Sequence, residues 1–200
     1  MKNIPLYCLA AASMALSFFF EKTPSFSGSP SAPVAAEASL LSLFSDDDSK
    51  KLEVPANDSA AYDYYGQALG VNLAHTENKT LLRTVLDWIG TPYRYGSNSK
   101  KGTDCSGFVT RVYQEVYGIT LQRSSRSMFS SVKHVDKDAM ETGDLVFFRR
   151  GPGQPIYHVG IYLKDGKFAH SACSGGVMVS SLKQEYYHRN FYAAGRVETN

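Results

Sequence analysis

The chain has 200 residues, of which 43% are hydrophobic and 20% are charged, and its formal net charge is +2. This length allows one domain of ordinary size with extensions, and the lack of any internal repeat excludes a repeat architecture. Lysines and arginines are scattered among aspartates and glutamates, and no nucleic-acid-binding motif gathers them, so we expect no nucleic-acid partner.

The N-terminal segment has the pattern of a secretory signal peptide. Residues 3–20 carry no charge, follow Lys2 and are rich in leucine, alanine and phenylalanine. With small residues at Ser25-Phe26-Ser27 for cleavage, the pattern predicts a signal peptide over residues 1–27. The alternative is an uncleaved N-terminal anchor, which is short for a membrane span. We expect export to the periplasm or cell envelope, with membrane contact only if the segment stays uncleaved.

Residues 28–75 have the composition of a linker or a loosely packed arm. The stretch up to residue 36 is rich in serine, proline and alanine, which is typical of a flexible tether. Residues 37–75 hold seven acidic residues and two lysines, a net charge of −5. A helix around residues 60–71 is compatible with this segment, but we expect most of it to be solvated.

Residues 76–200 carry the remaining elements and a net charge of +6, from eight lysines, nine arginines and eleven acidic residues. A basic domain suits an anionic partner, although ordinary solubilising charge explains the balance equally well. A helix is expected at about residues 78–89. We expect a monomer.

A second helix is predicted to begin at Cys105. Apolar residues recur after it at spacings of three and four, Gly118 ends the pattern, and Asp104 is a good N-cap. A thiol at a helix N-terminus faces free N–H groups, which favours the thiolate and predicts a pKa below that of a free thiol. A buried structural cysteine is the alternative, but the flanking polar residues and glycines favour a nucleophile.

Two histidines that could serve such a nucleophile lie on a predicted hairpin. Residues 145–148 read as a buried strand, residues 158–163 as the next one, and residues 167–171 as its return. His158 and His170 then lie on neighbouring strands. His75, His134 and His188 lack such a context and are interpreted as ordinary polar residues.

The parity of the turn decides whether these two histidines can meet. A two-residue turn at Asp165-Gly166 would put His158 and His170 on opposite faces, because side chains alternate along a strand. A three-residue turn, residues 164–166 with Gly166 left-handed, would set Gly160 opposite His170 and put both histidines on one face. A joint function for the pair therefore predicts the three-residue turn and a hydrogen bond between the two imidazoles, either directly or through one water.

Removal of the predicted signal peptide leaves two cysteines, Cys105 and Cys173. Cys173 points away from the histidine face in this register, and we interpret it as a free or semi-buried thiol. Cys105, His158 and His170 could instead bind zinc, but the close-spaced ligand pairs that announce zinc sites are absent. We expect no metal and no cofactor.

Three blocks of this sequence, in this order, resemble the NlpC/P60 cell-wall peptidases. They are Asp104-Cys105-Ser106-Gly107-Phe108-Val109, then Thr142-Gly143-Asp144-Leu145-Val146-Phe147-Phe148, then His158-Val159-Gly160-Ile161-Tyr162 with Phe168-Ala169-His170-Ser171. The resemblance runs from about Leu81 to Val197. The approach to the cysteine, Gly90-Thr91-Pro92-Tyr93-Arg94-Tyr95-Gly96 with Lys100-Lys101-Gly102, is similar to the Spr-type murein endopeptidases.

The resemblance implies an α+β, papain-like fold in which N-terminal helices pack on a central antiparallel sheet, with residues 76–200 as the catalytic domain. It implies cysteine-peptidase cleavage of peptidoglycan stem peptides or cross-links. Implied roles are nucleophile for Cys105, general base for His158 and orienting residue for His170. Near the oxyanion or the substrate it implies Tyr93, Asp104, Ser106, Arg123 and Ser124.

The sequence departs from the family pattern beside Arg123. Gln122 replaces a common proline and Met128 a common glutamine, and these positions help to line the substrate groove. Other function classes remain open: a wall-binding protein that keeps the fold without turnover, or a papain-like amidase or acyltransferase. Loss of the nucleophile or the base would favour the binding protein, and neither is missing.

Overall fold

The computed structural model describes residues 57–198, and the predicted signal peptide and most of the predicted linker lie outside the described residues. Most of the helices come first in the sequence, and the main sheet is formed largely by the C-terminal part of the described residues. The helices are α1 (Asp58–Leu69), α2 (Lys79–Trp88), α3 (Cys105–Tyr117), α4 (Ser125–Ser131) and α5 (Glu185–Asn190), with a 3₁₀ turn, η2 (Lys137–Ala139). Between residues 57 and 198, no helix is long and apolar enough to cross a membrane.

The main sheet has six strands in the order β3-β8-β4-β5-β6-β7, and each neighbouring pair is antiparallel. The strands are β3 (Lys133–Val135), β4 (Leu145–Phe148), β5 (His158–Lys164), β6 (Lys167–Ala172), β7 (Gly176–Ser181) and β8 (Phe191–Arg196). A separate two-stranded ribbon, β1 (Asn98–Ser99) with β2 (Gly102–Thr103), precedes α3. The predicted α+β class with an antiparallel sheet is confirmed.

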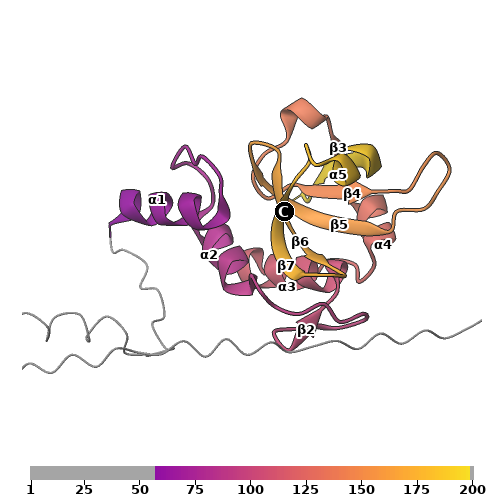
Figure 1. Ribbon diagram of the computed structural model, residues 1–200, viewed down its shortest axis with the longest axis horizontal. Coiled ribbons are helices and arrows are strands. Elements are labelled where there is room, and N and C mark those ends of the chain that lie inside the picture. Colours follow the sequence, from indigo (N-terminus) through magenta and orange to yellow (C-terminus); the bar gives the residue numbers. More distant parts are fainter. Residues whose placement is uncertain (1–56, 199–200) are drawn as a thin grey trace, which may run out of the picture. The chain divides into compact units, whose positions relative to one another are not determined.

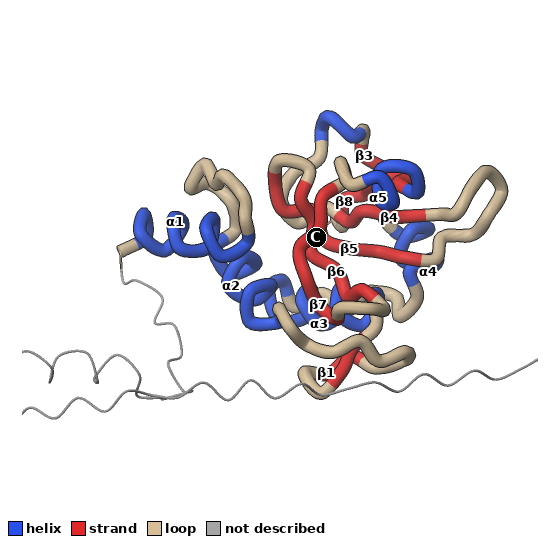
Figure 2. The backbone as a smooth tube through the Cα atoms, in the orientation of Figure 1, coloured by secondary structure: helices blue, strands red, loops and turns tan. Residues whose placement is uncertain are grey.

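Helix α3 packs directly on β5 and β6 and covers one face of this sheet, and α2 packs on α3 (Figure 1). Side chains alternate along the strands, so each face has its own core. The helix side buries Phe147, Val159 and Ile161 with the apolar stripes of α2 and α3. On the other face a smaller cluster gathers around Phe148 and Phe168. Figure 2 shows the sheet strands running side by side above α3.

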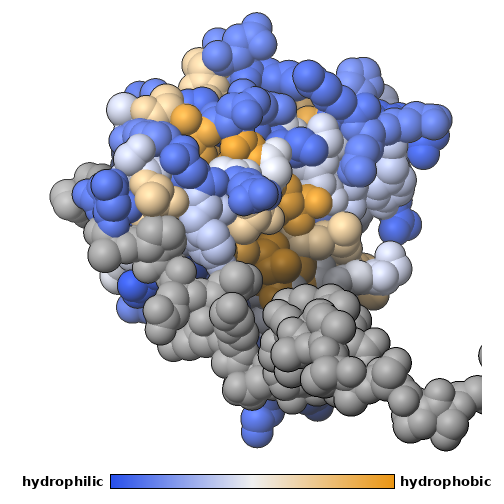
Figure 3. All heavy atoms as spheres, turned by 60° about the vertical axis from the view of Figure 1, so that its left-hand side comes forward, coloured by the Kyte–Doolittle hydropathy of each residue, from blue (hydrophilic) through white to orange (hydrophobic). Residues whose placement is uncertain are grey.

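Residues 57–75, which the sequence assigned to a linker or arm, form α1 and the loop that follows it. Helix α1 packs on α2. Tyr65 and Leu69 of α1 are buried in the main core. The surface seen from the α1 side is mostly hydrophilic, with hydrophobic residues exposed in a band between polar ones (Figure 3). The boundary of the catalytic domain at residue 76 stays a prediction, and α1 shares the core of that domain.

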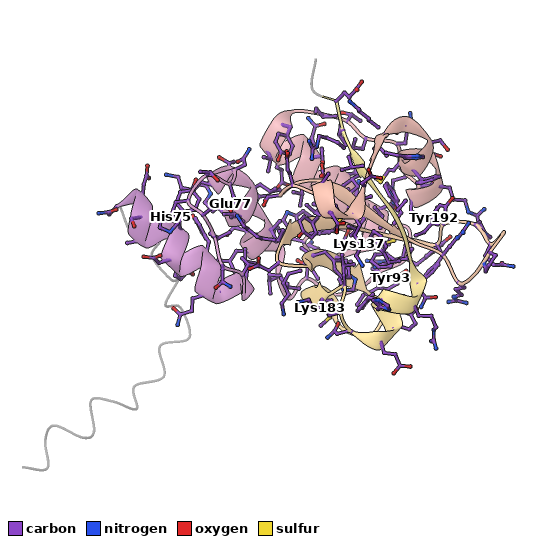
Figure 4. All side chains as sticks on the ribbon, turned by 90° about the horizontal axis from the view of Figure 1, so that it is seen from above. His75, Glu77, Tyr93, Lys137, Lys183 and Tyr192 are labelled. Carbon is purple, nitrogen blue, oxygen red and sulfur yellow. The ribbon has the colours of Figure 1, made fainter. Side chains whose placement is uncertain are left out.

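A buried ion pair fastens the loop after α1 to the sheet. The side chain of Glu77 is only 4% exposed and forms a salt bridge with Lys164 at the end of β5. The same carboxylate accepts hydrogen bonds from the main-chain N–H groups of Ala74 and Thr76. Burial alone would raise the pKa of Glu77, but the Ala74 amide and Lys164 outweigh it and lower the pKa to about 2. Figure 4 shows Glu77 beside α1 and well away from Tyr93.

This pair predicts a defined acid sensitivity. Because the pKa of Glu77 is lower in the folded state than its ordinary value of 4.5, the carboxylate stabilises the fold above pH 4.5 and loses that contribution as the pH falls toward 2. Glu77→Gln is expected to lower the free energy of unfolding at pH 7 by about 2 kcal/mol. In this variant the free energy of unfolding should also decrease less steeply between pH 4.5 and pH 2 than it does in the wild type. Urea unfolding at several pH values measures both. Glu185→Gln, at an exposed position on α5, is the control, and equal pH profiles for the two variants would contradict the role of Glu77.

The hairpin between β5 and β6 corrects the prediction of a three-residue turn. Lys164 pairs with Lys167, so the turn holds only Asp165 and Gly166. Both turn residues have positive φ, 53° and 74°, which is the conformation of a type I′ turn. The expected positive φ of Gly166 is confirmed, but the loop length is wrong.

A β-bulge restores the side-chain parity that this short turn would have reversed. The register shifts between Tyr162 and Lys164, which leaves Leu163 as one extra residue on β5. Beyond the bulge Tyr162 pairs with Phe168, and continuing that register sets Gly160 opposite His170. An odd-numbered loop was therefore not required, because one unpaired residue within a strand shifts the alternation by the same amount.

Candidate active site

Cys105 is the first residue of α3, as the sequence predicted. Asp104 is its N-cap, with an extended backbone, and one carboxylate oxygen accepts a hydrogen bond from the Gly107 N–H at 2.7 Å. Because the first N–H groups of a helix have no partner within it, they point past Cys105 into the space beside its thiol. The main-chain N–H groups of Val159 and Ser106 act on the thiol and favour its charged form, so both lie close to the sulfur. Val159 directly follows His158, so the nucleophile candidate lies against the start of β5.

The predicted hydrogen bond between the histidines is present. Nε2 of His158 lies 2.9 Å from Nδ1 of His170, and the two rings are nearly perpendicular. A Cβ at Gly160 would lie 2.7 Å from the Phe168 ring and 3.2 Å from the His170 Cβ, so only glycine leaves room for His170 there. Nδ1 of His158 makes no hydrogen bond within the described residues. It is therefore the nitrogen that remains for a proton from the thiol.

Burial keeps both imidazoles neutral. It lowers the pKa of the half-buried His158 to about 4. Burial and the neighbouring His158 lower the pKa of His170, which is 1% exposed, to about 3. At neutral pH each ring therefore holds one proton, and His158 is an acceptor of the kind that general-base catalysis needs.

The expectation of a lowered thiol pKa is wrong. Burial raises the pKa of Cys105, and the Asp104 carboxylate acts in the same direction, while the hydrogen bond from Val159 offsets only part of the rise. Sequence reasoning identified the helix terminus but could not see how deeply the thiol is buried. The resting pair is therefore a neutral thiol and a neutral imidazole.

A neutral resting thiol predicts how the alkylation rate of Cys105 depends on pH. The alkylation rate of Cys105 with iodoacetamide, followed residue by residue by mass spectrometry, is expected to rise with pH around an inflection above about 8.5, the value of a free thiol. The exposed Cys173 on the same protein serves as the internal reference. An inflection for Cys105 well below that of Cys173 would contradict a neutral resting thiol.

Three of the predicted site residues form one polar network beside Cys105. The guanidinium of Arg123 binds both carboxylate oxygens of Asp104 at 2.9 Å and donates to the Ser106 hydroxyl at 2.8 Å. Asp104 also accepts from the Gly96 N–H at 2.8 Å. Burial would raise the pKa of Asp104, but Arg123 and the amides outweigh it and lower that pKa. The network ties the loop before β1 and the segment before α4 to the start of α3.

Ser124 and Tyr93 line the same cleft as Cys105, and their expected roles at the oxyanion or the substrate stay predictions. The Ser124 hydroxyl caps α4 by accepting from the Ser127 N–H, so its first task is structural. Burial and the neighbouring thiols of Cys173 and Cys105 raise the pKa of Tyr93, which keeps its hydroxyl protonated and able to donate. The proximity of Tyr93 to Cys173 was not anticipated. Both cysteines are free.

These residues surround a cleft of about 650 Å³. It is lined by Tyr93, Tyr95, Gly96, Asp104, Cys105, Ser106, Arg123, Ser124, Ser125, Arg126, Ile156 and Tyr157. Its size suits a short peptide with several polar groups. Among residues 57–198, no set of three or more His, Cys, Asp or Glu side chains is arranged to hold a metal ion.

A cysteine at a helix N-terminus, packed against an antiparallel sheet, is the arrangement of the papain-like class. Residues 90–196 match the NlpC/P60 family, and the chain belongs to it. It is 39% identical over 141 residues to a probable endopeptidase of Haemophilus influenzae, covering 70% of this chain and 86% of that protein.

Two further comparisons agree with this assignment. The chain is 42% identical over 111 residues to the murein DD-endopeptidase MepS/murein LD-carboxypeptidase of Escherichia coli K12, covering 56% of this chain and 58% of that protein. The crystal structure of an NlpC/P60 family protein from Bacillus cereus superposes with a TM-score of 0.56 at 32% identity, covering 60% of this chain and 39% of that one.

Proposed function

We propose that this protein is a cysteine-type peptidoglycan endopeptidase that hydrolyses amide bonds in stem peptides or cross-links through a thioester acyl-enzyme. The observation that carries the proposal is the hydrogen-bonded His158–His170 pair together with Cys105, which begins α3, lies beside Val159 and lines a peptide-sized cleft. Family membership and the murein endopeptidases among the relatives support the substrate class.

In this mechanism Cys105 attacks the scissile carbonyl carbon while its thiol proton passes to Nδ1 of His158. His170 holds the opposite nitrogen of that ring and so fixes its orientation. The carbonyl oxygen becomes an oxyanion that accepts hydrogen bonds from the Cys105 N–H and the Tyr93 hydroxyl.

The tetrahedral intermediate collapses when His158 gives its proton to the amine that leaves, and the acyl group stays on sulfur as a thioester. Water then attacks the thioester carbonyl and loses a proton to the same nitrogen of His158. The thiolate that leaves takes the proton back, which returns both groups to their neutral resting forms.

The cleft has cations that suit the carboxylates of stem peptides. Arg123 is neutralised by Asp104, but Arg126 forms no salt bridge within residues 57–198. Its Nε donates to the Ile156 carbonyl at 3.2 Å, which fixes the guanidinium at the edge of the cleft. Arg126 is therefore the side chain of this cleft that remains free to pair with a substrate carboxylate.

The test is digestion of purified muropeptides with the full-length protein, followed by mass spectrometry of the products. New amine and carboxylate termini within a stem, or between a stem and its cross-link, support the proposal and identify the bond. Intact muropeptides that nevertheless bind to the protein would support the wall-binding alternative instead. A substrate in the cell wall also implies a location in the cell envelope, and we place the enzyme in the periplasm.

A further inference from the structure

The hydrogen-bonded histidine pair continues beyond His170 to two hydroxyl groups. Nε2 of His170 lies 2.9 Å from Oγ of Ser180 on β7 and 3.3 Å from the hydroxyl of Tyr187 on α5. Ser180 is 4% exposed, and Tyr187 is half-buried. Both nitrogens of His170 are thus engaged, one toward His158 and the other toward this hydroxyl pair.

A neutral imidazole has one donor and one acceptor nitrogen, so the chain of contacts has only two consistent proton arrangements. In the first, His170 donates from Nε2 to the hydroxyls and accepts at Nδ1 from Nε2–H of His158. Nδ1 of His158 is then bare and can take the thiol proton. In the second, His170 donates from Nδ1 to His158, whose own proton must sit on Nδ1, where it blocks general-base action.

The hydroxyl pair supplies the acceptor that the first arrangement needs. If Nε2 of His170 carries the proton, it can donate to the Ser180 oxygen at 2.9 Å, and the Tyr187 oxygen at 3.3 Å is a second acceptor. Without these hydroxyls a buried Nε2–H would have no partner, which costs more than leaving a nitrogen lone pair bare. Ser180 and Tyr187 therefore stabilise the first arrangement.

We propose that Ser180, assisted by Tyr187, is a positioning residue that stabilises the Nε2–H tautomer of His170 and thereby helps to hold the proton of His158 on Nε2. The catalytic consequence rests on the proposed peptidase function, whereas the tautomers themselves do not.

The tautomers are measured first, in a full-length Cys105→Ala protein, by nitrogen-15 NMR of the imidazole rings. With Ser180 and Tyr187 intact, His158 and His170 are both expected to carry the proton on Nε2. In the Ser180→Ala/Tyr187→Phe variant, His170 is expected to shift toward the Nδ1–H form. Unchanged tautomers in that variant would overturn the proposal, and muropeptide cleavage plays no part in this measurement.

Kinetics then test the consequence. Ser180→Ala/Tyr187→Phe is expected to lower kcat about tenfold with KM nearly unchanged, since neither side chain lines the cleft. In a Tyr187→Phe background, Ser180→Thr keeps a hydroxyl beside His170 and is expected to retain most of the kcat that Ser180→Ala loses. The controls are Ser181→Ala and Tyr192→Phe. The Ser181 hydroxyl accepts from the Lys183 N–H, and Tyr192 is exposed on the surface.

The outcomes separate the two proposals. A protein that leaves muropeptides intact but shows the expected tautomers contradicts the peptidase function and leaves the role of Ser180 standing. An active enzyme whose kcat is unaffected by Ser180→Ala/Tyr187→Phe contradicts the role of Ser180 alone. If the double variant melts well below the wild type, the single variants Ser180→Ala and Tyr187→Phe, which each keep one of the two acceptors, provide the same comparison.

Discussion

A Cys105→Ala variant is expected to lose muropeptide cleavage by a factor on the order of 10⁴ or more, because the acyl-enzyme cannot form without the sulfur. Cys105→Ser is expected to be equally inactive, since neutral His158 is a weak base for an alcohol. The free energy of unfolding is expected to stay within about 1 kcal/mol of the wild type, because the substitution removes a single sulfur atom. Product analysis by mass spectrometry and urea unfolding measure the two effects.

Cys173→Ser is the matched control for this experiment. It removes the other thiol of the described domain, which is exposed, and is expected to keep nearly full activity. A Cys105→Ala protein that still cut at the wild-type rate would show that the nucleophile lies elsewhere. Treatment with a chelator is expected to leave cleavage unchanged. Inhibition by the chelator that added zinc reverses would instead support zinc binding by Cys105, His158 and His170.

The second large effect is expected from Asp104→Ala. The Asp104 side chain is a buried carboxylate that caps α3, holds the Gly96 N–H and binds Arg123 through two hydrogen bonds. Its removal leaves a guanidinium without its counter-charge and several N–H groups unpaired. We expect the free energy of unfolding to fall by about 3 kcal/mol and cleavage to fall at least tenfold.

The control for this change is Asp136→Ala. Asp136 occupies the N-cap position of η2 but makes no side-chain capping hydrogen bond, so the expected change is within about 0.5 kcal/mol. Asp104→Asn keeps the capping oxygen, so its free energy of unfolding is expected to lie between those of the Asp104→Ala and Asp136→Ala variants. Equal stability of the Asp104→Ala and Asp136→Ala variants would show that the network around Arg123 contributes nothing to the fold.

What the sequence could predict depended on local patterns. The start of α3 at Cys105 and its end before Gly118 followed from a capping residue, a helical apolar stripe and a glycine, and the structure has both boundaries there. β4 likewise follows its unbroken apolar run from Leu145 to Phe148. The partnership of the two histidines was inferred from parity, and the hydrogen bond confirms the contact.

What the sequence could not predict depended on tertiary packing. No residue pattern marks Leu163 as unpaired, because a bulge is defined by the partner strand and not by the residue itself. The raised pKa of Cys105 comes from burial by elements that are distant in sequence. Ser180 and Tyr187 meet His170 only because β7 and α5 return to it, so their spacing along the chain carried no signal.

The bulge at Leu163 has a consequence for how this hairpin tolerates insertions and deletions. Deleting Leu163, or adding one residue to the Asp165-Gly166 turn, would each by itself send one histidine to the far side of the sheet. Making both changes together, or neither, preserves the pair. Among related sequences, a gap at this turn should therefore be accompanied by a compensating change within the neighbouring strand, and single-residue length differences here should be found only in chains that have lost the second histidine.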